Sequence, residues 1–484
     1  MKKEQNELKA NERKVTGEGA YAYSRYRAKQ EKTEAEELCE RMEEMHMNNF
    51  DNIIGYEEIK KELRQIADTL KNREIYAKLC SVPQNGLLLY GEPGVGKTMM
   101  ANAVIAESGL PFFICRKNKS NGDFVDEIKK NFDKAVAHAP AIVYLDDMDK
   151  FANVDRRHRN AEEFVTVQSC IDEVKGKEVF VLATANDIDC LPESLIRAGR
   201  FDRVMEICPP HDEDARKIIE HYMRQKPFVG ELDYDVIARI MDGRSCAELE
   251  TVINEAGLHA GYERSDVVTM EHFLKACMRA LFKIDYTRGD DEEDDEEDGF
   301  SLSVGDVSQI QKIAYHEAAH VVAHEVMCPN SVTLSTICAG DGGRGGVTSY
   351  CRRNMDAGLR ARCRVITSLA GMAVAEQVFG ECDMGCGRDL EAAFRTTRNL
   401  VGDMCSNGLS FFSFGYDDSE TRKARIEEAT TSQVEQYYRK VKELLSLNRE
   451  FLDKVAQALL SKKLITCADI KKIRESCTII SVAA

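Results

Sequence analysis

Long apolar runs are missing from this sequence. No stretch approaches the roughly 18 consecutive apolar residues of a membrane-spanning helix, and the charged residues from Lys2 onward argue against a secretory signal. The 17 cysteines form no C-x-x-C pair, and their odd number and apolar neighbours favour free thiols over a disulfide framework. We therefore expect no membrane span and a cytoplasmic location.

Positive charge is also in short supply. The 66 lysines and arginines face 83 aspartates and glutamates, which gives a formal net charge of −17. Such an acidic chain is disfavoured as a general binder of nucleic acid or of anionic membranes. We expect neither partner.

The length of 484 residues, 43% of them hydrophobic, predicts a globular chain of more than one domain. Consecutive acidic residues at 290–298 cannot be buried together and indicate a linker. We expect a charged N-terminal arm over 1–48, an α/β domain over 49–210, a helical subdomain over 211–286, an acidic linker over 287–300 and a mainly helical domain over 301–484. The arm suits either a mobile segment or an exposed helix.

Short apolar strands alternate with amphipathic helices between residues 85 and 209, which is typical of a parallel α/β sheet. The strands are expected at 86–90, 111–115, 141–145, 179–183 and 204–208. From residue 214 to about residue 284 the apolar residues recur at helical spacing. The last domain is expected to be mainly helical, with a Gly-rich strand region at 332–350.

A phosphate-binding loop, GEPGVGKT, follows the first expected strand and opens a helix, which is the context that this motif requires. Its glycines let backbone N–H groups surround phosphates, while Lys97 should contact the β and γ phosphates and Thr98 should bind Mg²⁺. The predicted nucleotide contacts are Gly91, Glu92, Pro93, Gly94, Val95, Gly96, Lys97 and Thr98.

Two aspartates follow the strand expected at 141–145, at the carboxyl edge where parallel sheets bind ligands. Asp146 is predicted to bind Mg²⁺ directly or through its water shell, and Asp147 is predicted to orient the attacking water. The expected ligand is therefore a nucleoside triphosphate with Mg²⁺.

The stretch HEAAH places His316 and His320 on one face of a helix, where both imidazoles can bind one zinc ion. Glu317 lies between them and can accept a proton from water at the metal. The alternative is a helix with two unrelated histidines.

Residues 50–284 resemble an AAA+ ATPase module. The stretch ATAND matches the sensor region of that family, which implies that Asn186 lies near the γ-phosphate. The stretch LIRAGRFDR matches the arginine-finger segment, which implies that Arg200 and Arg203 reach the ATP of a neighbouring subunit in a homo-oligomeric ring, usually a hexamer. Ordinary surface ion pairs are the alternative for both arginines.

Residues 300–473 resemble the peptidase domain of the FtsH family, which are membrane-tethered ATP-dependent zinc proteases. The matching pieces are AYHEAAH, GGVTSY, LAGMAVAE and GRDLEAA. The resemblance implies Asp389 as the third zinc ligand, with Glu376 as the next candidate, and leaves the fourth position for water. It also implies that GGVTSY is an edge strand that pairs with extended substrate.

The sequence departs from the FtsH pattern at four places. Transmembrane helices are absent, Asp147 stands where the family usually has glutamate, the aromatic pore loop is missing from 116–131, and residues 174–177 replace an Asp-Gly-Phe motif. Because aspartate is one methylene shorter than glutamate, we expect weaker positioning of water and slow ATP turnover.

The favoured function is an ATP-dependent zinc endopeptidase that degrades unfolded or loosely structured proteins. One alternative is an AAA+ remodelling ATPase with a non-degradative peptidase domain. The other is a zinc peptidase whose ATPase is a slow regulatory switch.

Overall fold

The computed structural model of the protein describes residues 49–79, 84–117, 124–151, 161–197, 199–224, 226, 230, 232–283, 307–338, 345–351, 356–380, 384–402 and 420–481. The chain divides into two compact units between Pro209 and Pro210. The predicted N-terminal arm and acidic linker lie outside the described residues, so the five domain limits stay predictions. Among the described helices, none has both the length and the apolar character needed to cross a membrane.

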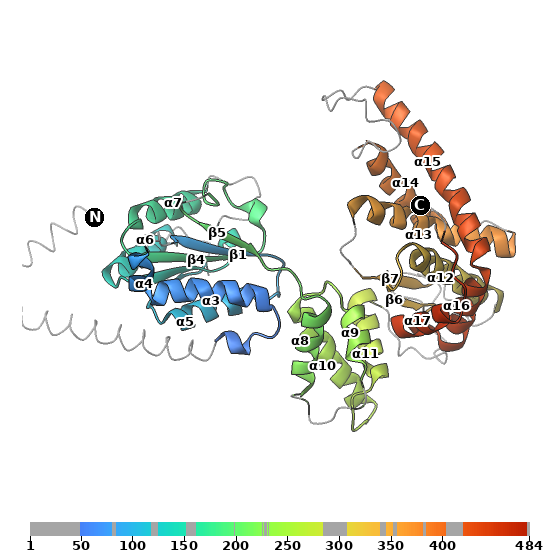
Figure 1. The fold of residues 1–484 in the computed structure, drawn as a ribbon, viewed down its shortest axis with the longest axis horizontal. Coiled ribbons are helices and arrows are strands. Elements are labelled where there is room, and N and C mark those ends of the chain that lie inside the picture. The colour runs from blue at the N-terminus through green and yellow to red at the C-terminus, as the bar shows by residue number, and fades with distance from the viewer. Residues whose placement is uncertain are drawn as a thin grey trace, which may run out of the picture. The chain divides into compact units, whose positions relative to one another are not determined.

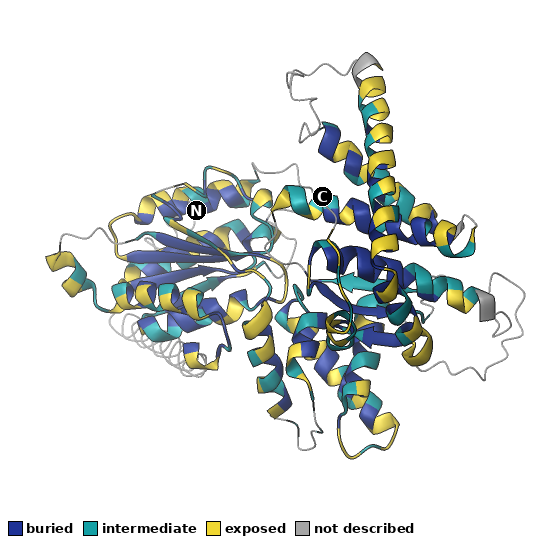
Figure 2. Cartoon of the chain, turned by 45° about the vertical axis from the view of Figure 1, so that its right-hand side comes forward, coloured by how far each residue is buried: buried dark blue, intermediate teal, exposed yellow. Residues whose placement is uncertain are grey.

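A parallel five-stranded sheet forms the centre of the first unit. Its strands are β1 (Gly86–Tyr90), β2 (Phe112–Cys115), β3 (Ala141–Leu145), β4 (Val179–Ala185) and β5 (Arg203–Glu206), in the order β2-β3-β4-β1-β5. β3 and β4 are buried along their whole length (Figure 2), as expected for apolar strands covered on both faces. All five predicted strands are confirmed, although β5 ends at Glu206 rather than at Cys208.

Helices cover both faces of this sheet (Figure 1). α3 (Glu57–Lys71) and α5 (Lys97–Ser108) pack together on one side, and α6 (Phe124–Ala137) and α7 (Glu162–Val174) pack together on the other. The short helix α4 (Arg73–Lys78) follows α3. Because the strands are parallel, the loops after β1 and β3 meet at the same edge of the sheet.

The second unit begins with the helices that the spacing of apolar residues predicts. They are α8 (Asp212–Arg224), α9 (Tyr234–Ile240), α10 (Cys246–Tyr262) and α11 (Met270–Cys277). A capping box formed by Ser245 and Glu248 starts α10. After Cys277 the helix continues as a π-helical turn over Met278–Phe282.

The rest of this unit surrounds the helix α12 (Val307–Met327). α12 packs against α13 (Ala357–Val374) and α16 (Arg449–Lys462), and it is rich in alanines that are fully buried, such as Ala314, Ala318 and Ala319. These small side chains let the neighbouring helices approach closely. The remaining helices are α14 (Gly387–Gly402), α15 (Glu420–Leu447) and α17 (Cys467–Glu475).

A small antiparallel sheet lies beside α12. It contains β6 (Val332–Thr336), β7 (Val347–Tyr350) and β8 (Leu464–Thr466) in the order β7-β6-β8. β6 and β7 confirm the predicted strand region. β8 is absent from the sequence prediction because three residues between two helices carry too little pattern to indicate a strand.

Candidate functional site

The loop between β1 and α5 has a backbone that glycine adopts more readily than any other residue. The φ angle is +147° at Gly91, +81° at Gly94 and +98° at Gly96. A Cβ atom on Gly91 would lie 2.2 Å from the carbonyl oxygen of Ile207. Val95 is buried, whereas Glu92 and Pro93 are exposed. The predicted phosphate loop therefore has the tightly turned backbone that its glycines indicate.

Lys97 begins α5 and reaches back into this loop. Its Nζ donates hydrogen bonds to the carbonyl oxygens of Gly91 (2.8 Å) and Glu92 (2.9 Å) and to Oδ1 of Asn186 (3.0 Å). Burial lowers the pKa of Lys97. The structure thus brings together the predicted phosphate-binding lysine and the predicted sensor residue, which follows β4. Thr98, the next residue of α5, is exposed.

Asp146 is buried at the carboxyl end of β3. Its Oδ1 accepts hydrogen bonds from the hydroxyls of Tyr144 (2.8 Å) and Thr184 (2.9 Å), and its Oδ2 lies 2.5 Å from Nη2 of Arg116. A magnesium ion at Asp146 would have to compete with Arg116 for this oxygen. The sequence gives no sign of Arg116, because the contact depends on β2 and β3 being neighbours.

Asp147 lies next to Asp146 with a positive φ of +53°. Its backbone N–H donates to Oγ1 of Thr184 (3.0 Å), and its Oδ2 accepts from Nζ of Lys150 (2.7 Å). Asp149, two residues further on, accepts from the backbone N–H of Asn186 (2.9 Å). The carboxylate of Asp147 is therefore held by a lysine.

The two predicted arginine fingers differ in their surroundings. Arg200 is 6% exposed and forms a two-point ion pair with Asp172, at 2.7 Å and 3.2 Å, while it also donates to the carbonyl oxygen of Ser194. The Arg200 and Lys175 contacts hold the pKa of the Asp172 carboxyl well below its usual range. Arg203 is about half exposed and lies 3.6 Å from Glu62. Only Arg203 is accessible in this arrangement.

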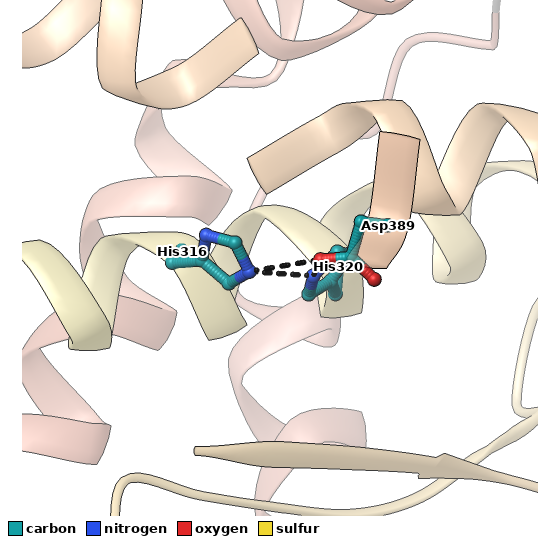
Figure 3. Close-up of side chains that lie close together, drawn as sticks. All are labelled: His316, His320 and Asp389. Carbon is teal, nitrogen blue, oxygen red and sulfur yellow. Dashed lines mark hydrogen bonds and ion pairs between the residues drawn. The ribbon is translucent and has the colours of Figure 1, made fainter. Parts of the chain in front are cut away.

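His316, His320 and Asp389 form one cluster (Figure 3). The Nε2 atoms of the two histidines are 3.0 Å apart, and Oδ2 of Asp389 lies 3.2 Å from Nε2 of His316 and 3.3 Å from Nε2 of His320. Among the described residues this is the only group of three or more metal-binding side chains that converge in this way. The cluster contains all three predicted zinc ligands.

Local structure explains why these side chains converge. The histidines lie one turn apart on α12, and Asp389 lies in the first turn of α14, where the helix dipole favours a carboxylate. On α13, a Cβ atom at Gly371 would lie 2.3 Å from the ring of His316. Glycine at this position therefore leaves the space that the imidazole occupies.

Contacts outside the cluster orient the ligands. Nδ1 of His320 donates to the carbonyl oxygen of Thr367 (2.7 Å), which directs Nε2 toward Asp389. Nδ1 of His316 lies 3.8 Å from the sulfur of Cys386. Two imidazoles and one carboxylate are the donor set of a catalytic zinc site. In such sites the second ring nitrogen of a histidine ligand is often held by a hydrogen bond, as it is in His320. The residues present therefore fit zinc.

The electrostatics of the cluster favour positive charge at its centre. Burial lowers the pKa of His320, but the hydrogen bond with Asp389 and the nearby carboxylates outweigh burial and raise it to about 9. At Asp389 burial is likewise outweighed by the contacts with His316 and His320, which hold the pKa of the carboxyl well below its usual range. A cation held by these three residues, whether a proton or a metal ion, is therefore stabilised.

Glu317 lies beside the cluster and is held by β7. Its Oε2 accepts a hydrogen bond of 2.6 Å from the hydroxyl of Thr348, which in turn lies 2.8 Å from the hydroxyl of Ser335 on β6. A Cβ atom at Gly346 would lie 2.6 Å from Cγ of Glu317, so only glycine leaves room for this side chain. The sequence pattern indicates Glu317 but neither hydroxyl.

Glu376, the alternative third ligand, lies outside the cluster. Its carboxylate pairs with Lys442 at 2.6 Å and accepts a hydrogen bond of 2.6 Å from Tyr438. These contacts tie the π-helical turn Ala375–Phe379 to α15. Glu376 therefore has a structural role in this arrangement.

Comparison with known proteins places two kinds of domain in the chain. Residues 87–209 match the ATPase family associated with various cellular activities (AAA), residues 231–275 match the AAA+ lid domain, and residues 304–473 match peptidase family M41. Both the nucleotide loop and the metal cluster lie within the matched residues.

Similar proteins extend over most of the chain. The ATP-dependent zinc metalloprotease FtsH of Caldicellulosiruptor bescii is 30% identical over 463 residues, which cover 88% of this chain and 71% of the relative. That of Thermotoga maritima is 30% identical over 467 residues, covering 88% and 72%. The ATP-dependent zinc metalloprotease FtsH 3 of Synechocystis is 28% identical over 478 residues, covering 89% and 74%.

Proposed function

This chain belongs to the family of FtsH-type ATP-dependent zinc metalloproteases, and from this premise we propose that it uses ATP to deliver unfolded or loosely structured proteins to the zinc site of its peptidase domain. The observation that carries the proposal is the cluster of His316, His320 and Asp389, with Glu317 beside it, in a chain that also contains a glycine-rich phosphate loop.

His316, His320 and Asp389 are the residues that would hold zinc. When bound, zinc supplies Lewis acidity that polarises water and the carbonyl group of a peptide bond. Thr367 keeps His320 oriented through its carbonyl oxygen. The short contacts within the cluster support this assignment.

Glu317 is the proposed general base, which accepts a proton from the attacking water and passes it to the leaving amine. Its side chain is 5% exposed, and Thr348 fixes one of its oxygens. β7 lies at the edge of its sheet. An extended substrate that pairs with β7 would therefore lie beside Glu317, since Thr348 belongs to the same strand.

The nucleotide site is proposed to bind ATP with Mg²⁺ through residues that the structure gathers at one edge of the sheet. Lys97 would exchange its contacts with the loop carbonyls for the β and γ phosphates, and Asp146 and Thr98 would bind Mg²⁺. Asn186 lies 3.0 Å from Lys97, which supports its proposed position near the γ-phosphate. Asp147 would orient the attacking water.

We propose that subunits assemble as a homo-oligomeric ring, with a hexamer as the expected form. The exposure of Arg203 supports a contact with the nucleotide of a neighbouring subunit, whereas Arg200 could take part only after its pair with Asp172 opens. A cytoplasmic location is proposed because the odd number and the apolar neighbours of the 17 cysteines favour free thiols, which a reducing compartment maintains. We propose no nucleic-acid partner, on the net charge of −17.

The test is digestion of a loosely folded protein with and without ATP, and with and without a zinc chelator. We expect degradation only when both ATP and zinc are present. Degradation that survives the chelator would contradict zinc proteolysis. Zinc-dependent degradation at the same rate without ATP would favour the second candidate, a zinc peptidase with a slow regulatory ATPase, which the ion pair between Asp147 and Lys150 also favours.

A further inference from the structure

Two buried cysteines lie side by side, one just after the end of α12 and the other on α13. Cys328 follows the last turn of α12, Cys363 lies on α13, and their Sγ atoms are 2.8 Å apart. Non-bonded heavy atoms usually pack at about 3.5–4.0 Å, whereas the sulfurs of a disulfide are about 2.05 Å apart. The two thiols therefore lie closer than ordinary packing requires, and a small movement would bring them to bonding distance.

The pair continues a row of polar contacts between α12 and α13. The first is the hydrogen bond from His320 to the carbonyl oxygen of Thr367, and the second joins His324 to the hydroxyl of Thr367 at 3.1 Å. Cys328 lies one turn beyond His324, and Cys363 lies one turn before Thr367. The thiols thus occupy the position where the next contact between the two helices falls.

We propose that Cys328 and Cys363 are an oxidation site at which a small peroxide forms a reversible disulfide between α12 and α13. The pair lies two turns beyond the proposed zinc ligand His320 along the chain and is not part of the metal cluster. Proteolysis itself does not require this oxidation site.

The two thiols differ in pKa and in exposure, and this reaction needs one thiol that is more reactive than the other. The hydrogen bond between the two thiols lowers the pKa of Cys328, and the same contact, together with burial, raises the pKa of Cys363. Cys328 is 7% exposed and Cys363 is 1% exposed. Because Cys328 is the more exposed of the two thiols, we assign it as the thiol that reacts with the oxidant and Cys363 as the resolving thiol.

The chemistry balances with one peroxide molecule. The thiolate of Cys328 attacks one oxygen of hydrogen peroxide, the O–O bond breaks, and the sulfur becomes a sulfenic acid while one water forms after proton uptake. The sulfur of Cys363 then attacks the sulfenic sulfur and gives up its proton, the S–O bond breaks, and a second water leaves. Two thiols lose two hydrogens, and the peroxide is reduced to two waters.

The proposed disulfide would hold α12 and α13 together, and the contact between these helices orients His320. A disulfide between residues 328 and 363 closes a long loop of chain and removes conformational freedom from the unfolded state. We expect the unfolding midpoint of the oxidised chain to rise by several degrees, and to return to its original value after treatment with a thiol reductant. If the unfolding midpoint is unchanged in protein shown to carry the disulfide, the bond does not stabilise these helices, and this expectation is contradicted.

The experiment treats the full-length chain with limiting hydrogen peroxide, blocks the remaining thiols in denaturant and maps unreduced peptides by mass spectrometry. We expect a linked pair of peptides containing Cys328 and Cys363, with a mass two hydrogens below the sum of the masses of the two separate peptides. Absence of this pair when the exposed Cys208 is already oxidised would overturn the proposal. So would a link from Cys328 to the buried Cys351, whose backbone N–H donates to Ser331 nearby.

Variants identify the role of each thiol. Cys363→Ser should leave Cys328 as a sulfenic acid that dimedone captures, whereas Cys328→Ser should leave Cys363 as an unreacted thiol. Cys277→Ser is the matched control, because Cys277 is equally buried on α11 and lies 3.9 Å from Met241 rather than beside a second cysteine thiol. It should form the 328–363 link as the native chain does. Equal dimedone labelling of the native chain and Cys363→Ser would show that Cys363 does not resolve the sulfenic acid, which would contradict the proposal.

Discussion

Thr348 shows how one hydroxyl can govern the proposed general base. It donates to Oε2 of Glu317 from the edge strand β7 and is itself within 2.8 Å of Ser335. A hydrogen bond to an ionised carboxylate is among the stronger kinds in proteins. Thr348 is therefore a positioning residue, which holds Glu317 without contributing a proton-transfer group of its own.

Replacing Thr348 with valine keeps the shape of the side chain but removes this hydrogen bond. We expect Thr348→Val to lower kcat for peptide cleavage by about 10- to 100-fold with KM little changed, which is the usual range for groups that support a metal site. Thr348→Ser should retain most of the activity because it keeps the hydroxyl. Steady-state kinetics at equal zinc content measure both variants. Equal loss in the serine variant would show that packing, and not the hydrogen bond, matters.

Asp147 is the residue proposed to orient the attacking water in the nucleotide site. Its side chain is one methylene shorter than glutamate and pairs with Lys150 at 2.7 Å, so a water in line with the γ-phosphate of bound ATP would lie farther from this carboxylate than from that of a glutamate. Misplacement by about 1 Å can cost a factor of roughly 10² in rate. We expect slow native ATP hydrolysis, faster hydrolysis by Asp147→Glu and almost none by Asp147→Asn, each at unchanged nucleotide affinity. An asparagine variant as active as the native chain would remove Asp147 from the catalytic residues.

At the scale of elements, α12 combines two of the proposed zinc ligands with a third histidine that lies in different surroundings. His324 is 7% exposed, stacks on Tyr350 with ring centroids 4.1 Å apart, and has no hydrogen-bond partner for Nε2 among the described residues. Burial and the nearby His320 lower the pKa of His324 to about 4. This histidine is therefore neutral at pH 7.

The lowered pKa makes the stability of the second unit depend on pH. The unfolded chain takes up a proton at His324 near pH 6.5, whereas the folded chain does so only near pH 4, so stability is lost as the pH falls between these values. We expect this group to remove up to about 3 kcal/mol of the free energy of unfolding.

Denaturant unfolding at several pH values tests this contribution by comparing the native chain with His324→Asn. The variant should show a shallower dependence of the unfolding free energy on pH. His221→Asn, at an exposed position on α8, is the matched control and should keep the native dependence. Identical slopes in all three proteins would contradict the account of His324.

The same elements show what the sequence can predict. The phosphate loop and HEAAH are local patterns, each within one loop or one helix, so the residues themselves indicate Lys97, His316 and Glu317. Asp389 is 73 residues from His316 in the chain, and only the resemblance to a known family indicates it. Thr348, Thr367 and Arg116 carry no local signature, because each reaches the site through the packing of separate elements.

At the scale of the whole molecule, ATP hydrolysis should require contact between subunits. Arg203→Ala should bind nucleotide normally but hydrolyse it roughly 10³-fold more slowly, because the charge that stabilises phosphoryl transfer is lost. Lys97→Ala should be inactive for a different reason, since it lacks the phosphate-binding lysine. Mixing the two should restore part of the ATPase rate, because a Lys97→Ala subunit supplies Arg203 to its neighbour. No recovery between proteins shown to exchange subunits would contradict action across an interface.

The most direct test of ATP-driven zinc proteolysis compares the native chain with Glu317→Gln in the degradation of a loosely folded protein with ATP. The glutamine keeps the size of the side chain and can still accept the hydrogen bond from Thr348, but it cannot accept a proton. We predict native zinc content and native ATP hydrolysis in the variant, with no cleavage of the protein substrate. Cleavage by Glu317→Gln at the native rate would contradict the account.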